Sequence, residues 1–91
     1  MGDVADRLER KLRAAFQPTE LRVIDQTNEH HGHAGWRESG ETHFRVEITA
    51  PGFAGLSRVE RQRQIYAALA EDMNNPVHAL SLLTKAPGEA G

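Results

Sequence analysis

The first part of the chain repeats apolar residues at the spacing of an α-helix. The repeating set is Val4, Leu8, Leu12 and Phe16, with Ala5 and Ala15 beside it. Residues four positions apart lie on the same face of a helix, so this set predicts an amphipathic helix. Asp3 stands at the position of an N-cap, and Pro18 disfavours the helical conformation for the residue before it. We therefore expect the helix to run from Asp3 to about Phe16.

Three later stretches carry the pattern of β-strands. Residues 42–50, THFRVEITA, alternate cleanly between apolar and polar side chains, as a half-buried strand does. Residues 21–25, LRVID, alternate more weakly, and residues 77–85, VHALSLLTK, form the last strand. The apolar face of the middle strand would consist of Phe44, Val46 and Ile48.

A second helix is predicted between the last two strands. Ser57, with Glu60 three positions later, is the sequence signature of a capping box. Residues 74–76, NNP, would end this helix. The expected apolar stripe consists of Val59, Tyr66, Leu69 and Met73, interrupted by the polar Gln62 and with Ile65 alongside.

The order of these elements, α-β-β-α-β, predicts an α+β fold. A loop between the first two strands permits an antiparallel pair, whereas the helical connection makes the second and third strands parallel, with a right-handed crossover. We expect a three-stranded mixed sheet with both helices packed on one face. The 91 residues would form one domain. It would carry a long polar loop at residues 26–41 and a disordered tail at residues 86–91.

Composition narrows the class of protein. The chain contains no cysteine, so it can form neither a disulfide nor a thiolate metal site by itself. Its net charge of −2 argues against a dedicated nucleic-acid-binding protein. The N-terminus does not resemble a targeting peptide, and no apolar run is long enough to span a bilayer. No catalytic constellation stands out. We expect a cytoplasmic protein that has no membrane partner and is not an enzyme.

Histidines are the main source of candidate chemistry. The stretch NEHHGHAGW, residues 28–36, contains three of the five histidines, His30, His31 and His33. Because parallel strands begin at the same end of a sheet, the predicted fold brings this loop, His43 and His78 to one edge. Imidazole is a common metal ligand. Loop histidines beside glycines are, however, more often simply solvated, so both interpretations stay open at this point.

The absence of cysteine leaves two kinds of metal site. A self-contained zinc site with three histidines would also need a base and a cleft, for which a chain of this size has little room. Alternatively, the chain could supply only the histidine half of an iron–sulfur cluster in which one iron has His ligands and the other has Cys ligands. A partner would then have to bring the sulfur ligands.

Four separated motifs make the chain resemble the BolA family. They are an F-x-G-x-S turn (Phe53, Gly55, Ser57), an arginine-rich helix start (Arg61, Arg63), a Y-x-x-L pair (Tyr66, Leu69) and the strand motif VHALS (residues 77–81). The loop HHGHAG followed by ETHF resembles the subgroup whose variable loop carries His and not Cys. One departure is Gln62, where the family often has His between two arginines. The resemblance covers nearly the whole chain and implies a fold similar to class II KH domains.

The resemblance also implies a function. BolA-like proteins pair with monothiol glutaredoxins, and the heterodimer can bridge a [2Fe–2S] cluster whose other side is held by the glutaredoxin Cys and glutathione. The matching ligands here would be His78 and either His30 or His33, because counting from Asp25 favours the first and counting back from Thr42 favours the second. We therefore expect an adaptor in iron–sulfur cluster and iron homeostasis, monomeric when alone and without a cofactor until it meets its partner.

Nucleic-acid binding is the alternative function. KH-like folds bind single strands through a GxxG loop, and BolA-like proteins are also linked to transcription control. The match of GFAG to this loop is weak, because GHAG and GEAG fit equally well. Arg58, Arg61 and Arg63 could contact phosphates at the start of the second helix, or they could form a solvated helix face. Trp36 would either contact a partner or cover the sheet edge.

Overall fold

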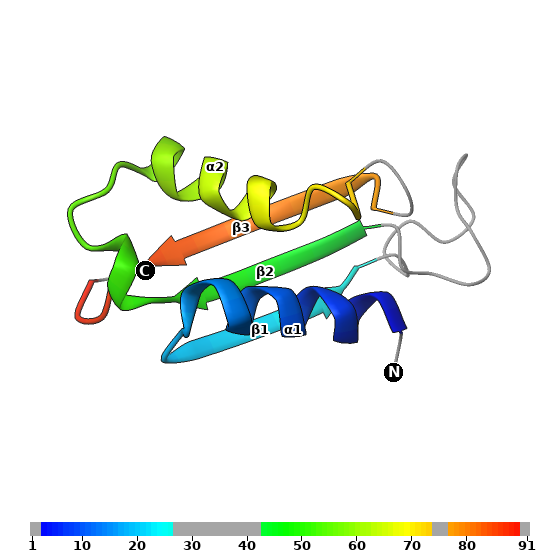
Figure 1. The fold of residues 1–91 in the computed structure, drawn as a ribbon, viewed down its shortest axis with the longest axis horizontal. Helices are drawn as coiled ribbons and strands as arrows, with labels where there is room; N and C mark the ends of the chain where they lie inside the picture. The colour runs from blue at the N-terminus through cyan, green and yellow to red at the C-terminus, as the bar shows by residue number, and fades with distance from the viewer. Residues whose placement is uncertain (1–2, 27–42, 74–76, 90–91) are drawn as a thin grey trace.

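The computed structural model describes residues 3–26, 43–73 and 77–89. Its elements follow the predicted order α-β-β-α-β, with one short 3-10 helix between the second strand and the second helix (Figure 1). None of the helices in this described part is both long and apolar enough to cross a membrane. The elements are α1 (Asp3–Phe16), β1 (Glu20–Asp25), β2 (His43–Thr49), η2 (Pro51–Phe53), α2 (Arg58–Ala68) and β3 (Ala79–Lys85).

The strands form one mixed sheet in the order β1-β2-β3. β1 pairs antiparallel with β2, so that Val23 lies opposite Val46. β2 pairs parallel with β3, so that Val46 also lies opposite Leu82. Figure 1 shows α1 and α2 on the same side of this sheet. The predicted α+β class, the mixed sheet and the placement of both helices on one face are confirmed.

The core lies between the helices and the face of β2 that the alternation predicts. Phe44, Val46 and Ile48 are each at most 1% exposed, and Leu8 and Leu12 of α1 belong to the same buried cluster. Burial of an apolar side chain of this size contributes roughly 1.5–3 kcal/mol. A shift of β2 by one residue would expose all three of its core residues, so the hydrophobic pattern also fixes the register of the sheet.

The connection from β2 to α2 explains the F-x-G-x-S motif in physical terms. Phe53 is fully buried, and its ring centroid lies 5.2 Å from that of Phe16. Gly55 has a φ of 80°, a left-handed conformation that strains residues with a side chain. Ser57 accepts a hydrogen bond from the Glu60 N–H, and the Glu60 carboxylate accepts one from the Ser57 N–H. The motif is thus an anchor, a turn and a helix cap, and the predicted capping box is confirmed.

The apolar stripe predicted for α2 is partly wrong. Val59 is 55% exposed and Tyr66 is 39% exposed, whereas the buried positions are Arg61, Ile65 and, just after the helix, Leu69. These three residues are four positions apart and therefore lie on one helix face. A long arginine stem can pack along apolar surface while its charged head finds a partner elsewhere. Arg61 therefore occupies a core-facing position that its charge would assign to solvent.

The segment after α2 also departs from the prediction. The helix ends at Ala68, well before residues 74–76, and turns follow it, in which the Ala70 and Asp72 N–H groups donate to carbonyls three positions back. Met73 then forms an isolated parallel bridge with Val77, and β3 begins only at residue 79. The chain thus leaves the helix several residues before the predicted stop.

Part of the predicted disordered tail is packed against the fold. Ala86 is only 4% exposed, and its N–H donates a hydrogen bond to the Glu89 carboxylate at 2.9 Å. Glu89 also pairs with Arg61 of α2. The predicted disorder of residues 86–91 is therefore corrected for residues 86–89, while residues 90–91 lie outside the described residues.

Candidate functional site

Two of the five histidines lie in the described residues, and both are at the same end of the sheet. His43 is the first residue of β2, and His78 directly precedes β3. The parallel register places His43 opposite Ala79, which is the neighbour of His78 in the chain. His43 is half-buried and His78 is exposed. The fold thus brings together two histidines that are 35 positions apart in the sequence (78 − 43).

The other predicted site residues of this end lie outside the described residues. They are His30, His31, His33 and Trp36. The segment that carries them leaves the described chain at Gln26 and returns at His43, and the Gln26 N–H donates to the His43 carbonyl at 2.8 Å. Both ends of the segment are therefore held at the end of the sheet where His78 lies. That a loop histidine joins His78 in one site stays a prediction.

No complete metal site is present within residues 3–26, 43–73 and 77–89, where no group of three or more His, Asp or Glu side chains could hold a metal ion. His43 and His78 do not by themselves make such a group. A metal or cluster bound at this end would need further ligands from the loop or from another molecule.

The backbone next to His78 is held on both sides. Val77 is completely buried, and its N–H donates to the Asp72 carbonyl at 3.0 Å. Ala79 begins β3 on the other side. An exposed imidazole on a backbone that is already ordered loses less conformational entropy when it binds a ligand atom. His78 is therefore the described histidine best suited to bind something from solvent or from a partner.

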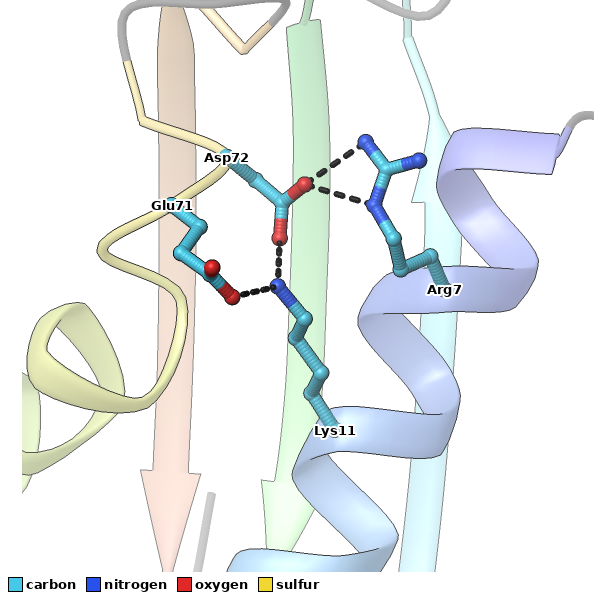
Figure 2. Close-up of polar contacts among 4 residues, drawn as sticks. All are labelled: Arg7, Lys11, Glu71 and Asp72. Carbon is cyan, nitrogen blue, oxygen red and sulfur yellow. Dashed lines mark hydrogen bonds and ion pairs between the residues drawn. The ribbon is translucent and has the colours of Figure 1, made fainter.

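Near this end of the molecule, ion pairs join α1 to the residues that follow α2. Figure 2 shows the Asp72 carboxylate between two cations that project from α1. Arg7 contacts one carboxylate oxygen through Nε at 2.7 Å and through Nη2 at 2.6 Å. Lys11 Nζ donates to the other oxygen at 2.7 Å and to the Glu71 carboxylate at 3.1 Å. Since Asp72 is only 2% exposed, its charge is neutralised almost entirely by α1.

These contacts change the protonation behaviour of the cluster. Burial by itself would raise the pKa of Asp72, but the hydrogen bonds from Lys11 and Arg7 outweigh it, so the pKa of Asp72 is lowered. The same hydrogen bond to Asp72, followed by the one to Glu71, raises the pKa of Lys11. The charged state of both partners is therefore favoured in the folded chain.

The sequence carries only a weak signal for this cluster. Arg7 and Lys11 are four positions apart and flank the apolar stripe of α1, which is also typical of a solvated helix face. Asp72 lies 65 positions from Arg7, and nothing in the local pattern pairs them. Only the packing of α1 beside the end of α2 makes them neighbours.

The three arginines predicted to contact phosphates do not form one exposed group. Arg58 and Arg63 are exposed, but Arg61 is only 8% exposed. Its guanidinium donates to both carboxylate oxygens of Glu89, at 2.7 and 2.8 Å, and to the Thr84 carbonyl at 3.2 Å. The expected basic set is corrected to Arg58 and Arg63, because Arg61 is occupied inside the fold.

The basic residues and the histidines define two separate surfaces. A hollow beside the start of α2 is lined by Arg58, Gln62 and Lys85, among others. Figure 1 shows the start of α2 and the end of β3 at one end of the molecule, and the starts of β2 and β3 at the other. Any ligand of His78 is therefore far from any ligand of Arg58.

Comparison with known proteins gives a consistent result. The family model for BolA-like protein matches residues 12–89. The chloroplastic protein BOLA1 of Arabidopsis thaliana is 41% identical over 88 residues, which are 94% of this chain and 55% of that protein. The DNA-binding transcriptional regulator BolA of Escherichia coli (strain K12) is 43% identical over 81 residues, 89% of this chain and 73% of that protein. The solved BolA domain of SufE1 from Arabidopsis thaliana superposes with a TM-score of 0.87 at 38% identity and 99% coverage of both chains. This chain thus spans about half the length of the chloroplastic relative.

Proposed function

This chain belongs to the BolA-like protein family, and from this membership we propose that it is a cytoplasmic adaptor for iron–sulfur cluster and iron homeostasis. It would bind a monothiol glutaredoxin and share a bridging [2Fe–2S] cluster with it. The role is regulatory and not catalytic, in keeping with a family in which the Escherichia coli relative is named a regulator. The observation that carries the proposal is the exposed His78 on an ordered backbone, in a chain that has no cysteine.

The available donor atoms fit half of such a cluster site. Iron–sulfur clusters with mixed ligands use imidazole on one iron and thiolate on the other. This chain can offer imidazole and has no thiolate to offer. His78 would be one ligand, and His30 or His33 of the segment between Gln26 and His43 would be the other. The glutaredoxin cysteine and glutathione would supply the sulfur ligands of the second iron.

The chain's own contribution is binding and orientation. The bound cluster would supply redox-active iron, and the protein would supply neutral imidazole nitrogens held at one end of the sheet. Trp36, in the same segment as the loop histidines, would contact the glutaredoxin. His43 shares this end of the sheet but is half-buried, so it serves as the natural comparison residue and not as a proposed ligand.

Cluster reconstitution tests the proposal directly. The chain is mixed with a monothiol glutaredoxin, glutathione, iron and sulfide, and the visible circular dichroism spectrum is recorded. The variants are His78→Ala, His30→Ala and His33→Ala, with His31→Ala and His43→Ala as matched controls. We expect a spectrum that differs from the glutaredoxin homodimer, and its loss in His78→Ala and in one of the two loop variants. Retention of the mixed spectrum in His78→Ala, or no mixed species with wild type, would contradict the proposal.

DNA binding is a second candidate function, favoured by one observation. The Escherichia coli relative, 43% identical, is named a DNA-binding transcriptional regulator. In this chain Arg58, exposed at the start of α2, lines a hollow together with the half-buried Lys85, and Arg63 is exposed on the same helix. These cations could contact phosphates without involving His78.

Salt-dependent affinity separates this candidate from the first. Each lost phosphate contact should reduce the slope of log affinity against log salt by about 0.9 on duplex DNA. We would measure binding of the wild type, Arg58→Ala and Arg63→Ala, with Arg10→Ala on α1 as an exposed control. Equal slopes in all four proteins would exclude a role for the α2 arginines.

A further inference from the structure

We infer that Asp72 is a positioning residue for His78, because it ties the backbone that carries this histidine to α1. The inference rests on the proposed role of His78 as a ligand. Asp72 itself is buried and would not touch the cluster or the partner. Its effect would pass through the main chain of Val77.

The first step of the argument is the side chain of Asp72. It receives three short contacts from α1, two from Arg7 and one from Lys11, at 2.6 to 2.7 Å (Figure 2). Both Arg7 nitrogens converge on one carboxylate oxygen and Lys11 binds the other, so charge-assisted contacts fix both oxygens. The carboxylate is thus fixed relative to the axis of α1, which packs on the sheet through Leu8 and Leu12.

The second step is the main chain of Asp72. Its carbonyl accepts the Val77 N–H at 3.0 Å, and its N–H donates to the Leu69 carbonyl at 2.9 Å. Met73, the next residue, forms the bridge with Val77. Asp72 and Val77 therefore form the base of the connection between α2 and β3, where its two ends are joined. His78 directly follows Val77 in the chain.

The third step compares Asp72 with its neighbour. Glu71 also binds Lys11, at 3.1 Å, but its side chain is 88% exposed and its main chain takes no part in the contacts with Val77. Glu71→Gln removes one charge from the same cluster and leaves the base of the connection intact. It is the matched control for Asp72→Asn, which keeps the size of the side chain and removes its charge.

Hydrogen exchange tests the positioning without any cluster. If Asp72 holds the base of the connection, the Val77 amide should exchange about tenfold faster in Asp72→Asn, while the Val46 amide in the centre of β2 stays as slow as in wild type. Glu71→Gln should leave both amides unchanged. Unchanged exchange at Val77 in Asp72→Asn would overturn the inference.

The stability of the bound cluster then tests whether this positioning matters to the proposed ligand. The measured quantity is the rate at which the glutaredoxin heterodimer loses its cluster to a chelator. Asp72→Asn should speed this loss about three- to tenfold, because it loosens the backbone that carries His78, whereas Glu71→Gln should leave the rate unchanged. An Ile65→Val variant with a similar melting temperature measures the effect of a general loss of stability, and it should speed the loss less than Asp72→Asn does.

The outcomes distinguish the two proposals. If the cluster forms but Asp72→Asn loses it no faster than Glu71→Gln or Ile65→Val, the positioning role is overturned. If wild type forms no mixed cluster, the proposed function fails, and the positioning of His78 is decided by the exchange of Val77 alone. Faster exchange confined to Asp72→Asn would then support it, and equal exchange would reject it.

Discussion

Charged residues in the interior of this protein are neutralised by partners that are distant in the sequence. Asp72 is paired with Arg7 of α1, and Arg61 is paired with Glu89 near the end of the described chain. Removing one partner of a buried pair leaves a charge that water cannot fully solvate. These pairs therefore join segments far apart in the chain, and they do so at opposite ends of α2.

The pair of Arg61 and Glu89 predicts a defined loss of stability in acid. The hydrogen bonds from Arg61, and then the one from the Ala86 N–H, lower the pKa of Glu89 from 4.5 to about 2. A carboxyl group whose pKa is lower in the folded state stabilises the fold above its ordinary pKa, and this contribution is lost as the pH falls through the folded value. The contribution of Glu89 should therefore be complete above about pH 4.5 and absent near pH 2.

Urea unfolding of wild type and Glu89→Gln at several pH values measures this contribution. The difference between their midpoints should be largest near neutral pH and should shrink toward zero between pH 4.5 and about 2. Glu89 is 41% exposed, so solvent screening reduces the size of the difference. Glu20→Gln, a change at an exposed residue of β1, serves as the control for the charge removed. A wild-type advantage that persists unchanged at pH 2 would contradict the assignment.

At the level of elements, the accuracy of sequence-based prediction followed the strength of the hydrophobic pattern. α1 and β2 have clean periods, and their buried faces were predicted correctly. The predicted stripe of α2 failed because Arg61 occupies a buried position while Val59 is exposed. Hydrophobic periodicity assumes that charged residues face solvent, and it has no means of anticipating a partner such as Glu89, which is 28 positions away.

Mutations on the two faces of α2 check this corrected orientation. Ile65 is completely buried, so Ile65→Ala should lower the free energy of unfolding by about 2–5 kcal/mol. Val59 is 55% exposed, so Val59→Ala should change it by no more than about 0.5 kcal/mol. Denaturant unfolding at neutral pH measures both changes. The slope of the unfolding free energy against denaturant concentration should be the same in all variants, as the control for a two-state transition. Similar losses in the two variants would favour the stripe predicted from the sequence.

For the whole molecule, topology was more predictable than the candidate site. The order of elements and the rule that crossovers are right-handed leave few arrangements of three strands and two helices. The same topology placed His43 and His78 at one end of the sheet. The contacts that hold His78, through Val77 and Asp72, depend on how α1 packs beside the end of α2. No local pattern in the sequence encodes that packing.

The composition of the whole chain makes a prediction about assembly. Iron–sulfur clusters are held chiefly by cysteine thiolates, with imidazole in their place on one iron of mixed-ligand clusters, and this chain of 91 residues contains no cysteine. Incubated alone with iron, sulfide and glutathione, it should stay monomeric by light scattering and develop no visible absorption from a cluster. With a monothiol glutaredoxin it should form a coloured heterodimer of one chain each, and a glutaredoxin whose active-site cysteine is replaced by serine should fail to form it. A coloured species from the isolated chain would mean that its histidines hold iron without a partner, and the division of ligands between two proteins would then be wrong.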